Sequence, residues 1–139
     1  MDQRHACAQA DYSKPRITLT ALDYEGLSGL ARAAMTTMPD IASSLADELK
    51  RAHVLPQDRQ FGNIVSMGCN VEFRDEMTGN LQRVTLVYPS EADIALSKIS
   101  VLTPIGTALI GLRVGSSITW ETRTGELKRL TVLEVRETA

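Results

Sequence analysis

The chain is short of aromatic residues, cysteines and long apolar runs, and each shortage excludes a class of protein. Aromatic side chains make up 4% of the 139 residues, too few for a platform that stacks single-stranded nucleic acid. No stretch approaches the roughly 20 apolar residues that cross a bilayer, and residues 1–14 lack the apolar segment of a secretion signal. The two cysteines, Cys7 and Cys69, lie in unlike segments. We therefore expect a cytoplasmic protein without a disulfide bond.

An excess of charge is also missing. Fifteen Lys and Arg residues stand against 17 Asp and Glu residues, so the chain lacks the positive field that drives binding to phosphate backbones. Direct binding of nucleic acid is not expected. The 43% of residues that are apolar suffice, in a chain of this length, for a core that needs neither disulfides nor a structural metal.

The amino-terminal part has the period of helices. After a tail at 1–16, which we expect to be disordered, Thr20 is a predicted cap with Asp23 three residues later, as in a capping box. A first helix is predicted over 22–35 and a second from Asp40, its expected cap. The apolar residues with helical spacing are Leu27, Leu30, Ala31, Ala34 and Met35, then Ile41, Leu45, Leu49 and Ala52. Residues 17–56 therefore read as a short antiparallel helical hairpin, a short coiled coil, followed by a linker at 57–63.

The remainder, 64–139, has the period of strands. Cys69, Val71 and Phe73 alternate with polar residues, and turn residues at 78–80 lead into a second strand. Further strands are expected at 81–88, 97–103, 117–122 and 127–137, with a short helix starting at Pro104. On the last strand, Leu127, Thr131, Leu133 and Val135 are predicted to share one face. Trp120 belongs to the preceding strand, where it alternates with Ile118, and we expect it to have a core or half-exposed packing role. The fold class is therefore α+β.

Motifs of known chemistry are weak. His5 and His53 have no partner at metal-ligand spacing, and His53 reads as a favourable residue in the last turn of a helix. Gly106 and Gly111 have the separation of a phosphate loop, but Leu112-Arg113 replaces the required Lys-Ser/Thr pair. We therefore expect no catalytic residue, no metal site and no cofactor.

Two acidic pairs are the remaining candidates for binding a divalent cation. Asp47-Glu48 stands in a predicted helix, with Asp47 four residues before Arg51, which suits a surface ion pair. Asp75-Glu76 leads into a predicted hairpin turn. Structural roles are favoured for both pairs, because such charges are commonly solvated.

Several motifs resemble the carboxyl-terminal domain of Gre-type transcription elongation factors. They are the acidic segment Pro89–Asp93, the run Ile99–Gly111, then Gly115 and Thr124-Gly125, in that order within about 64–136. The chain is more similar still to the Rnk family, regulators of nucleoside diphosphate kinase. Three features carry this resemblance: Tyr88-Pro89 directly after a strand, the stretch Leu-Arg-Val-Gly at 112–115, and a short helical arm.

The resemblance implies an FKBP-like antiparallel five-stranded domain and a partner, bacterial RNA polymerase. In Gre-type proteins this domain grips a coiled coil at the rim of the secondary channel, and the helical hairpin enters the channel. Carried over by position, Thr103, Pro104 and Ile105 would form the contact turn, with Glu91 and Asp93 as charged companions. A rigid turn led by proline orders at little cost when it docks.

The predicted arm departs from the Gre pattern. Gre factors carry acidic residues at the tip of a long hairpin and stimulate transcript cleavage, whereas the tip here, represented by Met38, Pro39 and Asp40, offers one carboxylate. At 1.5 Å per residue the arm is about 20 Å long. The expected function is a regulator that binds polymerase and competes with Gre-type factors without stimulating cleavage, and DNA would be contacted only through polymerase.

Two alternatives come from the same resemblances. The Rnk name implies an effect on nucleoside diphosphate kinase, direct or through transcription. The FKBP-like fold raises prolyl isomerase activity, which needs an aromatic-lined pocket that so few aromatics supply poorly. Whether the arm enters the channel or folds back on the protein is left open by the sequence.

Overall fold

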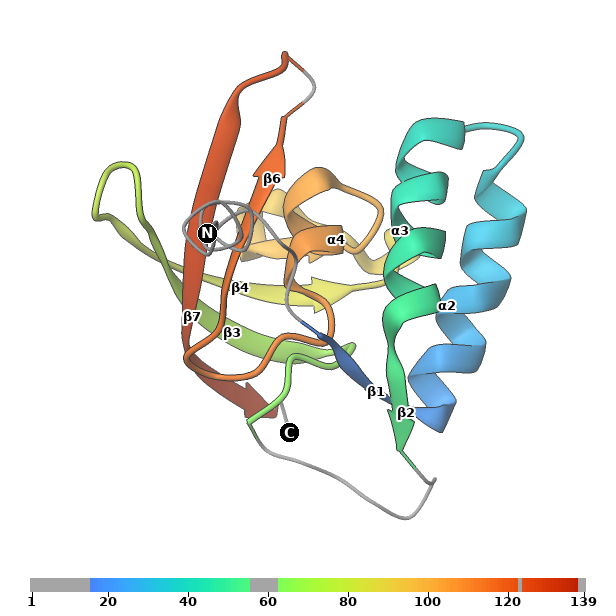
Figure 1. Ribbon diagram of the computed structural model, residues 1–139, viewed down its shortest axis with the longest axis horizontal. Helices are drawn as coiled ribbons and strands as arrows, with labels where there is room; N and C mark the ends of the chain where they lie inside the picture. The colour runs from blue at the N-terminus through green and yellow to red at the C-terminus, as the bar shows by residue number, and fades with distance from the viewer. Residues whose placement is uncertain (1–15, 56–62, 123, 138–139) are drawn as a thin grey trace, which may run out of the picture.

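A pair of helices lies beside a curved five-stranded sheet in the computed structural model, which describes residues 16–55, 63–122 and 124–137 (Figure 1). The predicted tail lies outside these residues except for Arg16, and so does the predicted linker except for Asn63. The elements are β1 (Thr18–Thr20), α2 (Ala21–Ala34), α3 (Pro39–Arg51), β2 (His53–Leu55), β3 (Cys69–Asp75), β4 (Leu81–Val87), η1 (Pro89–Glu91), η2 (Ile94–Leu96), β5 (Lys98–Ser100), α4 (Pro104–Leu109), β6 (Ser117–Glu121) and β7 (Leu127–Glu137). The predicted α+β class is confirmed.

The helix α2 begins where the sequence predicts. The Thr20 hydroxyl accepts a hydrogen bond from the backbone N–H of Asp23 at 3.1 Å, which satisfies one of the free N–H groups of the first turn. The buried residues of the helix are Leu27, Ala31 and Ala34, which belong to the predicted apolar face, whereas Met35 is 45% exposed.

The start of α3 differs from the prediction. Met38 is the N-cap and makes no side-chain capping bond, and Pro39 occupies the first helical turn. Proline suits that position because its fixed φ matches a helix and its missing N–H would be unpaired there in any case. Asp40 is therefore an exposed residue inside the first turn rather than the cap.

Two short strands that the sequence pattern does not reveal frame the helical hairpin. β1 and β2 pair in parallel at its base. The backbone N–H of Thr18 donates to the Gly111 carbonyl at 3.0 Å, and that of His53 donates to the Ile17 carbonyl at 2.9 Å. His53 begins β2 instead of ending a helix, so its predicted role at the helix dipole is wrong. Three residues are too few for a period of two to show.

The main sheet has the strand order β5-β4-β3-β7-β6. Its pairs are antiparallel except that β5 runs parallel to β4. In β3 the predicted alternation is confirmed, because Cys69, Val71 and Phe73 are buried. α4 covers part of the sheet beside β6 (Figure 1).

The predicted face of β7 is wrong because of a β-bulge. Leu130 and Val132 are fully buried, whereas Leu127 is 50% exposed. The pairing with β3 shifts register between Glu72 and Phe73, and an extra residue in one strand moves the following side chains to the opposite face. A single alternating pattern therefore cannot describe the whole strand.

The helical hairpin folds back on the sheet domain. α3 packs against α4, and residues of both helices belong to the same buried cluster as the sheet. α2 lies so close to Tyr88 that a Cβ added at Gly26 would stand 2.4 Å from the phenol oxygen. Glycine at position 26 therefore permits this contact. Within the described residues, no helix has both the length and the apolar character needed to cross a bilayer.

Asp23 ties α2 to the sheet domain. Its carboxylate accepts a hydrogen bond from the backbone N–H of Met67 at 3.1 Å, instead of closing the predicted capping box with Thr20. Burial raises the pKa of Asp23, and the bond from Met67 opposes this shift. Burial and then the Asp23 charge raise the pKa of Tyr88 nearby. The ionised carboxylate therefore costs free energy of folding while its hydrogen bond stabilises the contact.

We expect Asp23→Ala to lower the free energy of unfolding by about 1–2 kcal/mol, because it leaves the Met67 N–H without its acceptor. Asp23→Asn retains an acceptor and removes the titrating group. A carboxyl group whose pKa is raised on folding contributes stability at low pH and loses it as pH rises through that pKa. Urea unfolding between pH 3 and 7 should therefore show Asp23→Asn gaining on the wild type with rising pH. A constant difference between the two proteins would contradict this account.

Candidate protein-binding site

The predicted contact turn, Thr103 to Ile105, forms the N-terminal end of α4. The Thr103 hydroxyl caps the helix by accepting from the Gly106 N–H at 3.0 Å, and it donates to the Ser100 carbonyl at 2.8 Å. Pro104 occupies the first helical turn. The hydroxyl of Thr103 is thus used inside the turn, so Thr103 positions its neighbours, while the side chains of Pro104 and Ile105 are half-buried.

Two further residues fix the same turn from below. A Cβ added at Gly106 would lie 2.3 Å from the Ser100 carbonyl oxygen, so only glycine fits there. The buried Thr107 hydroxyl donates to the Val101 carbonyl at 2.8 Å. Leu109 is fully buried and belongs to the core. These contacts fix the conformation of the turn.

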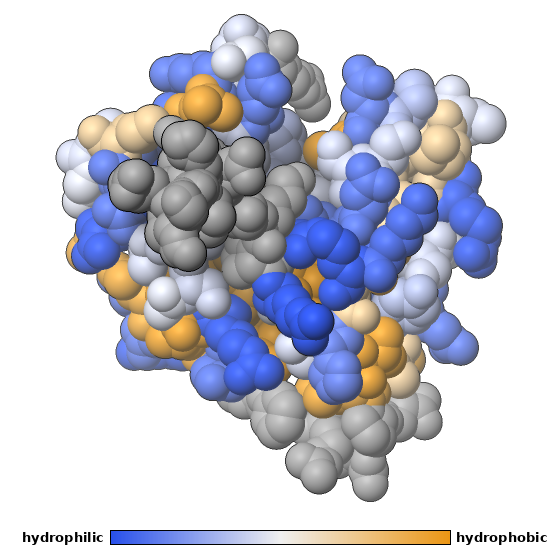
Figure 2. All heavy atoms as spheres, in the orientation of Figure 1, coloured by the Kyte–Doolittle hydropathy of each residue, from blue (hydrophilic) through white to orange (hydrophobic). Residues whose placement is uncertain are grey.

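A cleft of about 750 Å³ lies beside this turn and joins it to the tip of the helical hairpin. Figure 2 shows the molecule hollowed between the hairpin tip and the end of β6 and β7. The main lining residues are Met38, Pro39, Asp40 and Ile41 from the tip and α3, Pro104, Thr107 and Ala108 from α4, and Ile118, Trp120 and Glu121 from β6. The structure thus brings the predicted tip residues and Pro104 into one site.

Trp120 lines the cleft, a position that the sequence does not predict. Ile118, two residues earlier on β6, is buried, and Trp120 is half-buried and packed against the core. This agrees with the predicted packing role. Trp120 lines a cleft because the helical hairpin lies opposite this edge of β6. No local sequence motif predicts that arrangement.

The described charged residues of the cleft are all acidic, namely Asp40, Glu48 and Glu121. Glu48 is 2% exposed and forms an ion pair with Arg51 on the next turn of α3. The predicted surface pair of Asp47 with Arg51 is therefore wrong, because Arg51 bonds to Glu48. A cleft lined by both apolar and acidic side chains suits a protein segment that carries apolar and basic side chains.

The two predicted acidic companions lie outside this cleft. Glu91 lines a second concavity together with Gly26 and Tyr88. Asp93 caps η2, since its carboxylate accepts from the backbone N–H of Ala95 at 3.1 Å. The role of Asp93 in the loop is therefore structural.

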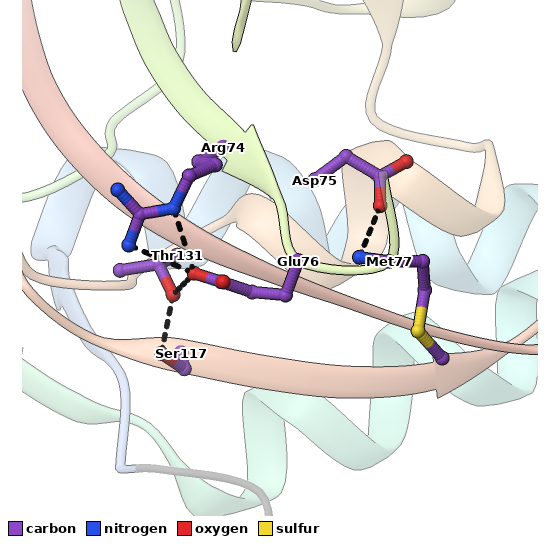
Figure 3. Close-up of polar contacts among 6 residues, drawn as sticks. All are labelled: Arg74, Asp75, Glu76, Met77, Ser117 and Thr131. Carbon is purple, nitrogen blue, oxygen red and sulfur yellow. Dashed lines mark hydrogen bonds and ion pairs between the residues drawn. The ribbon is translucent and has the colours of Figure 1, made fainter. Parts of the chain in front are cut away.

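The acidic pair at the β3–β4 turn has a structural role, as expected. The Glu76 carboxylate accepts from the Thr131 hydroxyl and from Arg74 at 3.2 Å (Figure 3). These bonds lower the pKa of Glu76. Asp75 accepts from the Met77 N–H at 2.8 Å in the turn. Among the described residues, no three His, Cys, Asp or Glu side chains gather as a metal ion would require.

Two family models cover the chain between them. The model described as Rnk N-terminus matches residues 15–55. The model described as transcription elongation factor, GreA/GreB, C-term matches residues 60–137. The division falls between β2 and β3, at the boundary between the helical hairpin and the main sheet domain.

Individual relatives agree with the models. The regulator of nucleoside diphosphate kinase of Escherichia coli K12 is 37% identical over 123 residues, which are 88% of this chain and 90% of the relative. Transcription elongation factor GreA of Caldanaerobacter subterraneus is 38% identical over 94 residues, which are 68% of this chain and 59% of the relative. The solved structure of a GreA/GreB factor from Nitrosomonas europaea superposes with a TM-score of 0.69 at 36% identity, covering 88% of this chain and 99% of that one.

Proposed function

Since this chain belongs to the family of GreA/GreB-type transcription factors, with an amino-terminal segment of the Rnk type, we propose that it binds bacterial RNA polymerase near the secondary channel and competes there with Gre-type factors. Proteins of this family are regulators and not enzymes in the ordinary sense. Polymerase is the partner that the name of the GreA relatives, transcription elongation factor, favours.

The observation that carries the proposal is the cleft beside the contact turn. Pro104, which corresponds by position to the Gre contact turn, shares this cleft with Met38 and with Trp120. Tryptophan is among the residues that most often supply the binding energy of a protein interface. The acidic groups of the cleft favour a basic partner segment.

The helical hairpin supports a role without chemistry. α2 has 14 residues and α3 has 13, so the hairpin is about 20 Å long at 1.5 Å per residue. Its second helix packs against α4, so the hairpin forms one wall of the cleft and does not project as a free arm. Asp40 is the single carboxylate of the tip segment 35–40, whereas the Gre-type hairpin carries acidic residues at its tip. Occupancy of the site is then the proposed means of competition.

We expect Trp120→Ala to weaken binding to core RNA polymerase about 10- to 30-fold, the scale of an interface hot spot, and Pro104→Ala to weaken it less. Leu81→Ala is the matched control, because Leu81 is 58% exposed on β4 and does not line the cleft. Fluorescence anisotropy with labelled protein measures the affinities, and thermal unfolding shows whether each variant folds. Unchanged affinity in both cleft variants would show that the cleft is not the binding site.

We also expect no stimulation of transcript cleavage in backtracked polymerase complexes. In the same assay the protein should reduce cleavage that a Gre factor stimulates, because the two compete for one site. Asp40→Ala should behave as the wild type does in both measurements. Cleavage that the wild type restores and Asp40→Ala does not would mean that the tip has a catalytic role.

A second candidate function is direct regulation of nucleoside diphosphate kinase. The relative from Escherichia coli bears that name and covers 88% of this chain at 37% identity. Calorimetric titration of the purified kinase with this protein separates the two readings. Binding of micromolar affinity or tighter would support direct action, and no heat of binding at such concentrations would leave an effect through transcription.

A further inference from the structure

The segment between β4 and β5 presents apolar side chains to solvent. Ile94 is 90% exposed, more than any other large apolar side chain among the described residues, and Leu96 is 62% exposed. Both belong to the single-turn helix η2. Neither lines the cleft beside Pro104, so the function proposed for that cleft does not account for them.

The segment holds this exposed position through its own hydrogen bonds. Asp93 and Lys98 exchange two backbone hydrogen bonds, each of 2.9 Å. The Asp93 carboxylate accepts from the Ala95 N–H at 3.1 Å, and the Asp93 carbonyl accepts from the Leu96 N–H at 3.0 Å. Binding to such a segment requires little ordering of the backbone, which removes one of the main costs of association.

One residue of the segment adopts a backbone conformation that disfavours side chains. Ser97 has a φ of 57°, and it is the one non-glycine residue with positive φ among those described. This conformation ends η2 and returns the chain to β5 directly after Leu96. Such a conformation persists because the surrounding bonds impose it, and here those bonds keep Ile94 in solvent.

The charges around the segment indicate the chemistry of a partner. Glu91 and Asp93 are both exposed, and neither forms an ion pair with any residue that the structure describes. A partner surface with basic side chains around an apolar pocket would complement them. A second copy of this chain fits less well, since the described charges of its cleft are acidic and the whole chain has a net charge of −2.

We propose that Ile94 and Leu96 form an apolar anchor that inserts into a basic-rimmed apolar pocket on RNA polymerase, as a second contact beside the cleft. This proposal rests on the proposed function, because it takes polymerase as the partner. Two contacts on one rigid protein would strengthen binding beyond either alone, since the second forms within an existing complex. Asp93 positions the anchor, and Glu91 supplies the charge that faces the basic rim.

The test compares Ile94→Ser, Leu96→Ser and Leu81→Ser for binding to core RNA polymerase by fluorescence anisotropy. Leu81 is the matched control, with 58% exposure close to the 62% of Leu96. All three side chains already face solvent, so the fold should tolerate the changes, which thermal unfolding checks. We expect at least a tenfold loss of affinity for Ile94→Ser, a smaller loss for Leu96→Ser and none for Leu81→Ser. Glu91→Gln should make binding less sensitive to salt.

The outcomes separate this proposal from the one on which it rests. If wild type binds polymerase and Ile94→Ser binds equally well, the anchor is wrong and the proposed function stands. If Ile94→Ser abolishes a dimer seen by sedimentation without changing polymerase affinity, the occupant is a second copy and the proposal is overturned. If wild type does not bind polymerase at all, both proposals fall.

Discussion

The structure depends on the close contact of Gly111 with Ile17 and Thr18, where the chain enters β1. A Cβ added at Gly111 would stand 2.6 Å from the Cβ of Ile17, and the φ of Gly111 is 80°. Glycine alone satisfies both demands, the left-handed backbone and the lack of space. The Gly111 carbonyl accepts from Thr18, and its N–H donates to the Val65 carbonyl at 2.9 Å. One residue thus joins the helical hairpin to the sheet domain.

This junction determines how the helical hairpin and the sheet domain pack together to form the cleft. Because β1 is held at the end of α4, α3 lies against α4 and its first turn faces β6. Neither segment alone contains the cleft, since Met38 comes from one and Trp120 from the other. A hairpin packed in this way does not project from the protein but forms one side of the cleft. The proposed site therefore exists only when both segments are folded together.

The sequence predicts the elements that have a repeated hydrophobic period over several residues or a specific residue at their end. These elements are the two main helices, the alternating strand β3 and the turn that begins with Pro104. The features that depend on distant partners do not appear. The bulge opposite Phe73 reverses the faces of β7, β1 and β2 are too short to show a period, and the carboxylate of Asp23 bonds to Met67, 44 residues away.

The same distinction applies to the predicted site residues. Pro104 and the hairpin tip carry local turn signals, but their meeting in one cleft follows from tertiary packing. Asp93 and Thr103 are predicted as contact residues by their position in the resemblance to Gre-type factors. In the structure each caps a short helix, Asp93 for η2 and Thr103 for α4. Because these polar groups form hydrogen bonds within the protein, they hold the neighbouring apolar side chains in place. At the two proposed binding surfaces we therefore expect apolar side chains to make the main contacts, with the acidic groups favouring a basic partner.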